Sequence, residues 1–165
     1  MKSRVNRAAR RSGGIFIGED RGEGGVATLR EALDLAPAAH VTLIGRADFD
    51  SDELASRLQS AAYLVLPTTT DDPMPRPLVE AFANAVPVIA SRIGSLAELV
   101  EPGRNGLLFE AGSARDLARH LMWAEAFPEK MRQMGECARA DYLARFISRW
   151  SYPTLFGERR RSARA

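Results

Sequence analysis

Short apolar runs alternate with longer amphipathic stretches along most of the chain. Short apolar runs are typical of buried strands, whereas apolar positions three or four residues apart are typical of helices that present one face to a core. The runs lie at 15–18, 40–45, 62–66, 87–90 and 107–109, and an amphipathic stretch follows each of them. Strands that alternate with helices predict an α/β fold, with a parallel sheet of about five strands and helices on both faces.

Capping residues and prolines predict where several helices begin and end. Ser113 precedes an amphipathic stretch, and its side chain can accept a backbone N–H of the first turn. Ser95 and Glu98 have the spacing of a capping box on a short helix. Pro128 cannot continue a helix, so the helix after Ser113 is expected to end near Phe127. The side chains expected to face the core from the helices are Val26, Leu29, Leu33, Ala36, Leu117, Leu121, Met122, Met131, Met134, Ala138 and Tyr142.

Composition and charge exclude several classes of protein. Hydrophobic residues make up 45% of the chain and charged residues 27%, which predicts a globular domain. The net charge of +2 hides an uneven distribution. Residues 1–13 carry +5 and residues 157–165 carry +3, so the body between them carries −6. An acidic body lacks the basic face that nucleic acid requires, so no nucleic-acid partner is expected. The basic ends are interpreted as solvated segments; the alternative is attraction to anionic lipid heads, at most a peripheral membrane contact.

The expected compartment and domain boundaries follow from cysteine usage and from the apolar runs. A single cysteine, Cys137, excludes an internal disulfide and fits a reducing cytoplasm. No apolar run approaches the ~20 residues of a membrane helix, and no signal peptide is recognisable. We therefore expect a cytoplasmic protein, with the inner face of the membrane as the peripheral alternative. Residues 1–13 are expected to be a basic flexible segment, 14–150 one folded domain and 151–165 a basic tail.

The stretch 67–91 carries the densest candidate chemistry. Its polar loop follows an apolar run, and ligands of parallel sheets bind outside the carboxyl ends of strands. Three prolines lead into the next helix, whose first backbone N–H groups favour an anion such as a phosphate. Glu80, expected in the first turn and kept ionised by the helix dipole, can accept sugar hydroxyls together with Asp72. This arrangement predicts a site for a nucleotide-diphosphate sugar.

The same stretch carries a family resemblance. Asp72-Pro-Met-Pro-Arg-Pro-Leu-Val-Glu80, followed by AFANAVPVIAS and GSLAE, resembles the carboxyl-terminal domain of glycosyltransferase family 4, whose members have the GT-B fold. The family has two glutamates separated by seven residues and then the run E-A-x-A-x-G-x-P-V-I-A-S; here the first glutamate is Asp72 and the glycine is Ala85. The resemblance extends from about Gly14 to Phe146 and implies a Rossmann-like half of a GT-B fold.

The resemblance implies roles for individual residues. It places Asp72 beside the donor sugar, as the catalytic candidate, and Glu80 on the nucleotide ribose. The diphosphate would be held by N–H groups from Pro75 to Leu78, assisted by Arg76. In the family, a hexosyl group moves from a nucleotide-diphosphate sugar to a glycan or lipid-linked acceptor, with retained configuration and with no metal or other cofactor. The remaining donor-binding candidates are Met74, Arg46, Gly94 and Ser95.

Departures from the family pattern lead us to expect weak or no transfer by the isolated chain. Two cations that usually contact the donor diphosphate fall on Glu19 and Gly24, and each good donor at such a site contributes ~3–4 kcal/mol. A strand–helix unit that the family has before the strand at 40–45 has no counterpart, so an exposed sheet edge is expected. The acceptor-binding amino-terminal domain also has no counterpart, and a separate chain is a possible partner.

Two alternatives to the enzyme remain open. The first is a non-catalytic nucleotide-sugar-binding module, or a half-enzyme that pairs with a separate amino-terminal chain. An unrelated receiver-like or flavodoxin-like domain would need an acidic cluster at the strand ends or a phosphate loop, which Asp71 and Asp72 match poorly. Neither His40 nor His120 is placed for acid–base chemistry, and no metal-ligand spacing is present.

Overall fold

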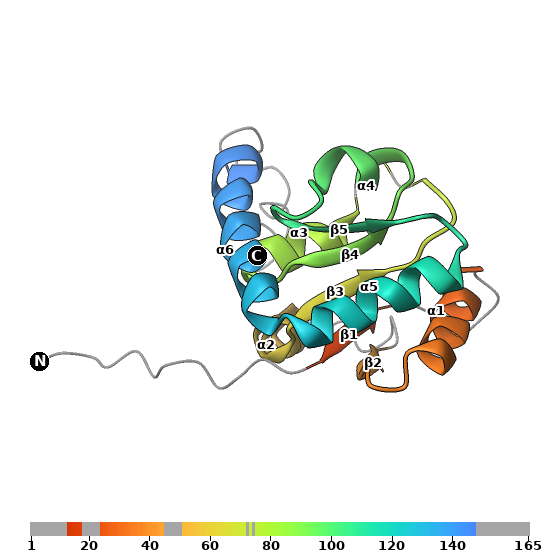
Figure 1. Cartoon of the computed structure of the whole chain (residues 1–165). Helices are drawn as coiled ribbons and strands as arrows, with labels where there is room; N and C mark the ends of the chain where they lie inside the picture. Colours follow the sequence, from red (N-terminus) through yellow and green to blue (C-terminus); the bar gives the residue numbers. More distant parts are fainter. Residues whose placement is uncertain (1–12, 18–23, 45–50, 72, 74, 148–165) are drawn as a thin grey trace, which may run out of the picture.

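The computed structural model describes residues 13–17, 24–44, 51–71, 73 and 75–147, and strands alternate with helices over these residues (Figure 1). The elements are β1 (Gly14–Ile17), α1 (Gly24–Leu35), β2 (Val41–Ile44), α2 (Ser51–Ser60), β3 (Tyr63–Leu66), α3 (Arg76–Ala83), β4 (Val88–Ser91), α4 (Gly94–Leu99), β5 (Gly106–Phe109), α5 (Ala114–Ala126), α6 (Pro128–Asp141) and the π-helix η2 (Tyr142–Ile147).

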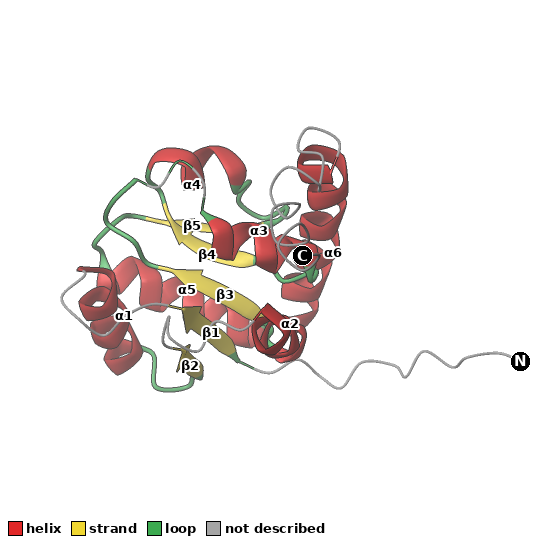
Figure 2. Ribbon diagram, turned by 180° about the vertical axis from the view of Figure 1, so that it is seen from behind, coloured by secondary structure: helices red, strands yellow, loops and turns green. Residues whose placement is uncertain are grey.

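The strands form one parallel sheet in the order β2-β1-β3-β4-β5 (Figure 2). Phe16 of β1 pairs with Leu43 of β2 on one side and with Val65 of β3 on the other. The inner strands β1, β3 and β4 are buried along their whole length, which explains why their sequences are continuously apolar. The predicted parallel five-stranded α/β fold is confirmed.

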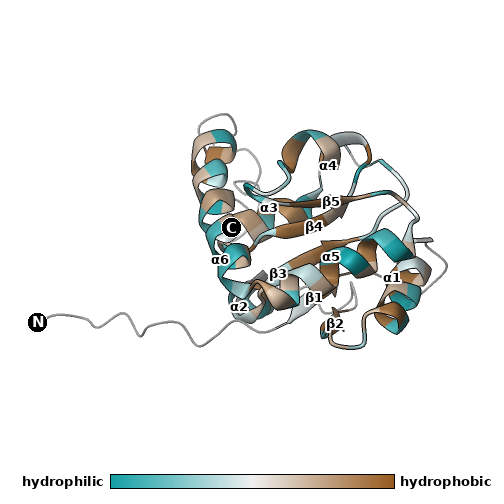
Figure 3. Ribbon diagram, in the orientation of Figure 1, coloured by the Kyte–Doolittle hydropathy of each residue, from teal (hydrophilic) through white to brown (hydrophobic). Residues whose placement is uncertain are grey.

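Helices cover both faces of the sheet, and successive residues of each inner strand point to opposite faces. In β3, Tyr63 and Val65 pack with α1, α5 and the first half of α6, whereas Leu64 and Leu66 pack with α2, α3 and α4. Colouring by hydropathy shows apolar strands between helices with mixed surfaces (Figure 3). No helix within the described residues has the length and apolarity needed to cross a membrane.

Most side chains predicted to face the core do so, with one error. Met122 is 46% exposed, because it lies one residue, about 100° of helix rotation, beyond the buried Leu121 of α5. Leu33 and Tyr142 are only partly buried. The remaining predicted core residues are buried: Val26, Leu29, Ala36, Leu117, Leu121, Met131, Met134 and Ala138.

The predicted boundaries of α5 are also confirmed. Ser113 is its N-cap, and the Ser113 side chain accepts the Asp116 backbone N–H at 3.2 Å. The helix ends at Ala126 with Phe127 as its C-cap, and Pro128 opens α6. A proline fits there because the first position of a helix has no intrahelical use for an N–H.

The sheet edge formed by β2 is open to solvent. Thr42 and Leu43 are both exposed, and Leu43 retains 45% of its accessible surface. Such exposure is unusual for a strand of a parallel sheet, because these sheets normally have both faces covered. An exposed edge had been expected from the sequence.

The turn between α3 and β4 is held closely by α6. Ala85 in this turn has a positive φ of 56°, in the left-handed region that favours glycine. This conformation gives a physical reason for the glycine that the family carries at this position. A Cβ on Gly135 of α6 would collide with the Ala85 carbonyl oxygen, and the Arg139 guanidinium donates to the Ala83 carbonyl at 2.7 Å. Helix α6 therefore supports the carboxyl end of α3.

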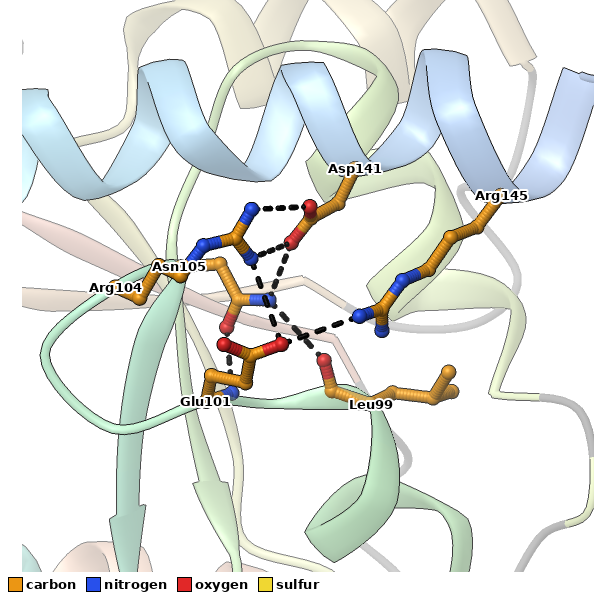
Figure 4. Close-up of polar contacts among 6 residues, drawn as sticks. All are labelled: Leu99, Glu101, Arg104, Asn105, Asp141 and Arg145. Carbon is orange, nitrogen blue, oxygen red and sulfur yellow. Dashed lines mark hydrogen bonds and ion pairs between the residues drawn. The ribbon is translucent and has the colours of Figure 1, made fainter.

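A polar network joins α6 and η2 to the loop before β5 (Figure 4). Asp141 accepts two hydrogen bonds from Arg104, at 2.6 and 2.7 Å, and one from Asn105 at 2.8 Å. Asn105 also accepts the Glu101 backbone N–H at 2.8 Å, and Arg145 donates to Glu101 at 3.1 Å. Arg104 holds the pKa of the Asp141 carboxyl below its usual 3.8, assisted by Asn105 and opposed by burial. These contacts fix the end of α6 and the part of η2 that pack against α3.

Candidate functional site

The candidate site lies where the carboxyl ends of the strands meet. The strand order reverses between β1 and β3, since the chain continues from β1 to one side and from β3 to the other. Ligands of open α/β sheets bind at this kind of switch point. Gly25 of α1 packs directly on the loop after β3, because a Cβ there would lie only 2.6 Å from the Pro67 carbonyl oxygen. The start of α1 and the loop after β3 thus form one side of the site.

The first half of the loop after β3 is held by its own hydroxyls and by β4. The Thr68 hydroxyl accepts the Thr70 backbone N–H at 3.2 Å and lies 3.0 Å from the Thr70 carbonyl oxygen, to which it donates. The Ser91 hydroxyl of β4 donates to the Leu66 carbonyl at 3.4 Å. The backbone that leads out of β3 is therefore fixed on both sides.

The second half of the loop contacts the start of α4. Asp71 Oδ1 accepts the Ser95 backbone N–H at 3.1 Å. Gly94 has a positive φ of 48°, and a Cβ on it would collide with the Asp71 carboxylate. The predicted capping box of Ser95 and Glu98 is wrong, because α4 already begins at Gly94 and its N-cap Ile93 makes no side-chain cap bond. A carboxylate 24 residues earlier in the chain caps the helix instead.

The start of α3 offers fewer backbone donors than the sequence suggested. Pro75 is the N-cap and Pro77 lies in the first turn, and neither has an N–H. The N–H groups of Leu78 and Val79 both donate to the Pro75 carbonyl, at 3.0 and 3.3 Å. Of the stretch from Pro75 to Leu78, only the Arg76 N–H is left for a ligand. The Leu78 side chain is fully buried in the core, so it does not reach a ligand.

Arg76 and Glu80 share one face of α3. They are four residues apart, a spacing that brings side chains together on a helix. Arg76 is exposed and Glu80 is half-buried, while Leu78, Ala81 and Phe82 form the buried face. The two side chains offer a positive charge and a carboxylate beside the loop after β3.

Two expectations about Glu80 are corrected by this geometry. It lies in the second turn of α3, because Pro75 sets the start of the helix at Arg76. The helix dipole acts mainly within the first turn, so it does not control this carboxyl. Burial raises the pKa of Glu80 above its usual 4.5, and the charge of Arg76 opposes that shift. Ionisation of Glu80 therefore depends on Arg76 more than on the helix.

The predicted site residues divide into three groups. Arg76 and Glu80 lie together on α3, with Pro75 at its start, and Gly94 and Ser95 open α4 beside the same loop. Asp72, Met74 and Arg46 lie outside the described residues, as does Glu19, where a family cation would fall. The sequence reading missed Asp71 as a structural link, because its partner is remote along the chain.

Away from this edge, a shallow depression lies on the flank formed by β5 and α5. It is lined by Leu107, Arg119, His120 and Trp123. His120 Nδ1 lies 2.7 Å from the Asp116 carbonyl oxygen of its own helix, a contact that fits the structural role expected of this histidine. Within the described residues, no three His, Cys, Asp or Glu side chains gather closely enough to hold a metal ion.

The strand order alone does not separate this fold from flavodoxin-like domains, which share it. The sequence decides between them, since the family model described as glycosyl transferases group 1 matches residues 15–141. The chain belongs to this family. The resemblance inferred from the motif between Asp72 and Glu80 is confirmed at the level of glycosyl transferases group 1.

Two curated relatives are similar to this group 1 chain over its central part. It is 36% identical over 98 residues to an uncharacterised glycosyltransferase of Methanocaldococcus jannaschii. This match covers 59% of this chain and 27% of the relative. It is 34% identical over 95 residues to a D-inositol 3-phosphate glycosyltransferase of Streptomyces bingchenggensis. This match covers 58% of this chain and 20% of the relative. The matched region is thus less than a third of either relative.

Two solved structures share the fold. HepE of Anabaena, determined in complex with UDP and glucose, aligns with a TM-score of 0.70 at 21% identity and covers 82% of this chain and 45% of HepE. The carboxyl-terminal domain of the group 1 protein LpcC of Francisella tularensis aligns with a TM-score of 0.70 at 20% identity, covering 81% of this chain and 86% of that domain. The chain therefore has the Rossmann-like fold of one half of a GT-B structure, as predicted.

Proposed function

We propose that the chain is the donor-binding half of a glycosyltransferase of family 4. In this proposal it binds a nucleotide-diphosphate sugar at the carboxyl edge of the sheet, for retaining hexosyl transfer to a hydroxyl of a glycan or lipid-linked acceptor. The observation that carries the proposal is the pair Arg76 and Glu80 on one face of α3, beside the switch point between β1 and β3. Membership of glycosyl transferases group 1 and the UDP complex of HepE support it.

The proposed roles follow from the chemistry of each side chain. The Glu80 carboxylate accepts hydrogen bonds from the ribose hydroxyls, and it must be ionised to do so with both oxygens. The Arg76 guanidinium donates two parallel hydrogen bonds to the diphosphate, a bidentate geometry that a lysine cannot reproduce. Asp72 acts beside the donor sugar, where the bond to the diphosphate breaks, and Met74, Arg46, Gly94 and Ser95 complete the donor site.

Backbone donors to the diphosphate come in part from α1 in this proposal. The prolines of α3 leave Arg76 as the one N–H between Pro75 and Leu78 that a ligand can use. The helix α1 has twelve residues, and its first N–H groups have no partner within the helix. Gly25 at this start lies against the Pro67 carbonyl, so an anion bound beside the loop after β3 would meet these N–H groups in the proposal.

Transfer by the isolated chain is proposed to be weak. The residues matched to HepE cover 45% of that protein, so the proposal assigns donor binding to this part and acceptor binding to the other half of a GT-B fold. The second candidate function, a non-catalytic nucleotide-sugar-binding module, is favoured by the small number of N–H donors at α3. Neither candidate uses a metal or another cofactor. Transfer on addition of an amino-terminal GT-B half would favour the enzyme, and binding without transfer would favour the module.

Calorimetric titration with UDP, GDP and ADP tests donor binding. We expect at least one of them to bind and to lose at least tenfold in affinity with Glu80→Gln, about 1.4 kcal/mol, because a neutral amide accepts hydroxyls less well. Glu31→Gln is the matched control, since Glu31 is exposed on α1. Equal affinity of the wild-type protein and Glu80→Gln for every nucleotide would refute the proposed site.

A further inference from the structure

We infer that Asp71 is a positioning residue, whose carboxylate ties the loop after β3 to the start of α4 and keeps the donor site in shape. The inference rests on the proposed function, and it adds a residue for which the sequence suggested no role. Asp71 Oδ1 accepts the Ser95 backbone N–H at 3.1 Å, although 24 residues separate them in the chain. The contact joins the loop after β3 to the helix that follows β4.

The backbone conformation of Gly94 and the space beside its Cα both allow this contact. Its φ of 48° is in the left-handed region, where a side chain is strained. A Cβ at this position would also collide with the Asp71 carboxylate, so the space beside Gly94 is already filled by that group. The backbone conformation thus favours glycine here, and a Cβ would in addition push the Asp71 carboxylate away from the Ser95 N–H.

The link lies farther along the loop than the hydrogen bonds near the end of β3. Hydrogen bonds of Thr68 and Ser91 fix the chain near the end of β3, at residues 66–70. Beyond Asp71 the loop continues to Pro75, where α3 and its Arg76 begin. Asp71 thus ties the loop to α4 between its fixed start and the helix that carries Arg76 and Glu80.

Asp71 itself is poorly suited to bind the donor. Its carboxylate is negative, as is a diphosphate, and one of its oxygens is already used by Ser95. A donor phosphate that needed the Ser95 N–H would have to displace Asp71. The two possible roles of Asp71 therefore have opposite consequences: a positioning residue aids donor binding, whereas a competitor of the phosphate opposes it.

The test compares Asp71→Asn, Asp71→Ala and Gly94→Ala with the wild-type protein. Asparagine keeps an oxygen that can accept the Ser95 N–H but removes the charge, and alanine removes both. Asp34→Ala is the matched control, because Asp34 is an exposed acid in the last turn of α1, at the opposite edge of the sheet. The two readouts are the UDP dissociation constant from calorimetry and the hydrogen-exchange rate of the Ser95 amide in the free protein.

We expect Asp71→Ala and Gly94→Ala to weaken UDP binding at least tenfold and to speed exchange of the Ser95 amide at least tenfold. Asp71→Asn and Asp34→Ala are expected to stay within twofold of the wild-type protein in both measurements. Unchanged or tighter UDP binding by Asp71→Ala would overturn the positioning role, and so would an equal loss with Asp71→Asn.

The exchange measurement separates this inference from the proposed function. If the wild-type protein binds none of UDP, GDP and ADP, the proposed function fails, and the positioning role toward a donor fails with it. In that case the Ser95 amide still reports whether the link exists, since exchange is measured without ligand. If exchange is unchanged in Asp71→Ala while the wild-type protein binds UDP, the link is overturned and the proposed function stands.

Discussion

Removal of the Arg104 guanidinium should destabilise the protein by about 3 kcal/mol. Asp141 has only 7% of its side chain exposed and accepts two hydrogen bonds from Arg104. With Arg104→Met the aliphatic stem is kept, and the buried carboxylate retains the hydrogen bond from Asn105. Breaking one side of a buried ion pair costs roughly 3–5 kcal/mol, and the lower value applies because Arg104 is itself 44% exposed.

The pH dependence gives the prediction a second, independent check. Because the pKa of Asp141 is lowered in the folded protein, its contribution to stability is present above the unfolded value of 3.8 and is lost as pH falls through the folded value. The difference in stability between the wild-type protein and Arg104→Met should therefore be largest near pH 7 and should shrink below pH 3.8.

Urea unfolding followed by circular dichroism, at pH 7 and again near pH 3, measures both effects. Asp141→Asn and the double variant complete a mutant cycle, in which neighbouring groups of one network are expected to couple by roughly 1–3 kcal/mol. Arg119→Met is the control, because Arg119 pairs with Asp116 on an exposed surface of α5. A loss below about 1 kcal/mol for Arg104→Met, or a loss that is equal at both pH values, would refute the reasoning.

Two further predictions concern the turn after α3 and the carboxyl of Glu80. Ala85→Gly should stabilise the protein by roughly 0.5–1 kcal/mol, since relief of the left-handed conformation exceeds the added entropy of the unfolded chain; chemical unfolding would show a lower midpoint if this is wrong. Glu80→Gln should raise the melting temperature more at pH 7 than at pH 4, because ionising a carboxyl of raised pKa costs stability as pH rises above 4.5; equal shifts at both pH values would contradict it.

The strands and most helix ends could be predicted because they depend on neighbouring residues. The apolar run at 62–66 becomes β3, and Pro128 separates α5 from α6. Met122 shows the limit of pattern reading, since a shift of one residue turns a side chain out of the core. Glu80 was misplaced by one turn because three prolines allow more than one start for α3.

Contacts between remote residues could not be predicted from one sequence. The cap of α4 comes from Asp71, 24 residues before Ser95, while Ser95 and Glu98 offered a local capping box that the chain does not use. Asn105 and Asp141 are 36 residues apart, so no local pattern connects them. Nothing in the local pattern distinguishes these polar residues from others on the surface, because their role depends on the neighbours that folding brings.

The position of α6 has a consequence for how the protein unfolds. Met131 and Met134 complete the apolar layer on one side of the sheet, and Ala138 completes the layer on the other. One helix therefore belongs to both halves of the interior, so displacement of α6 opens both layers. The two sides of the sheet are expected to melt in a single cooperative transition, and α3, which carries Glu80, should lose its packing against α6 in that same step.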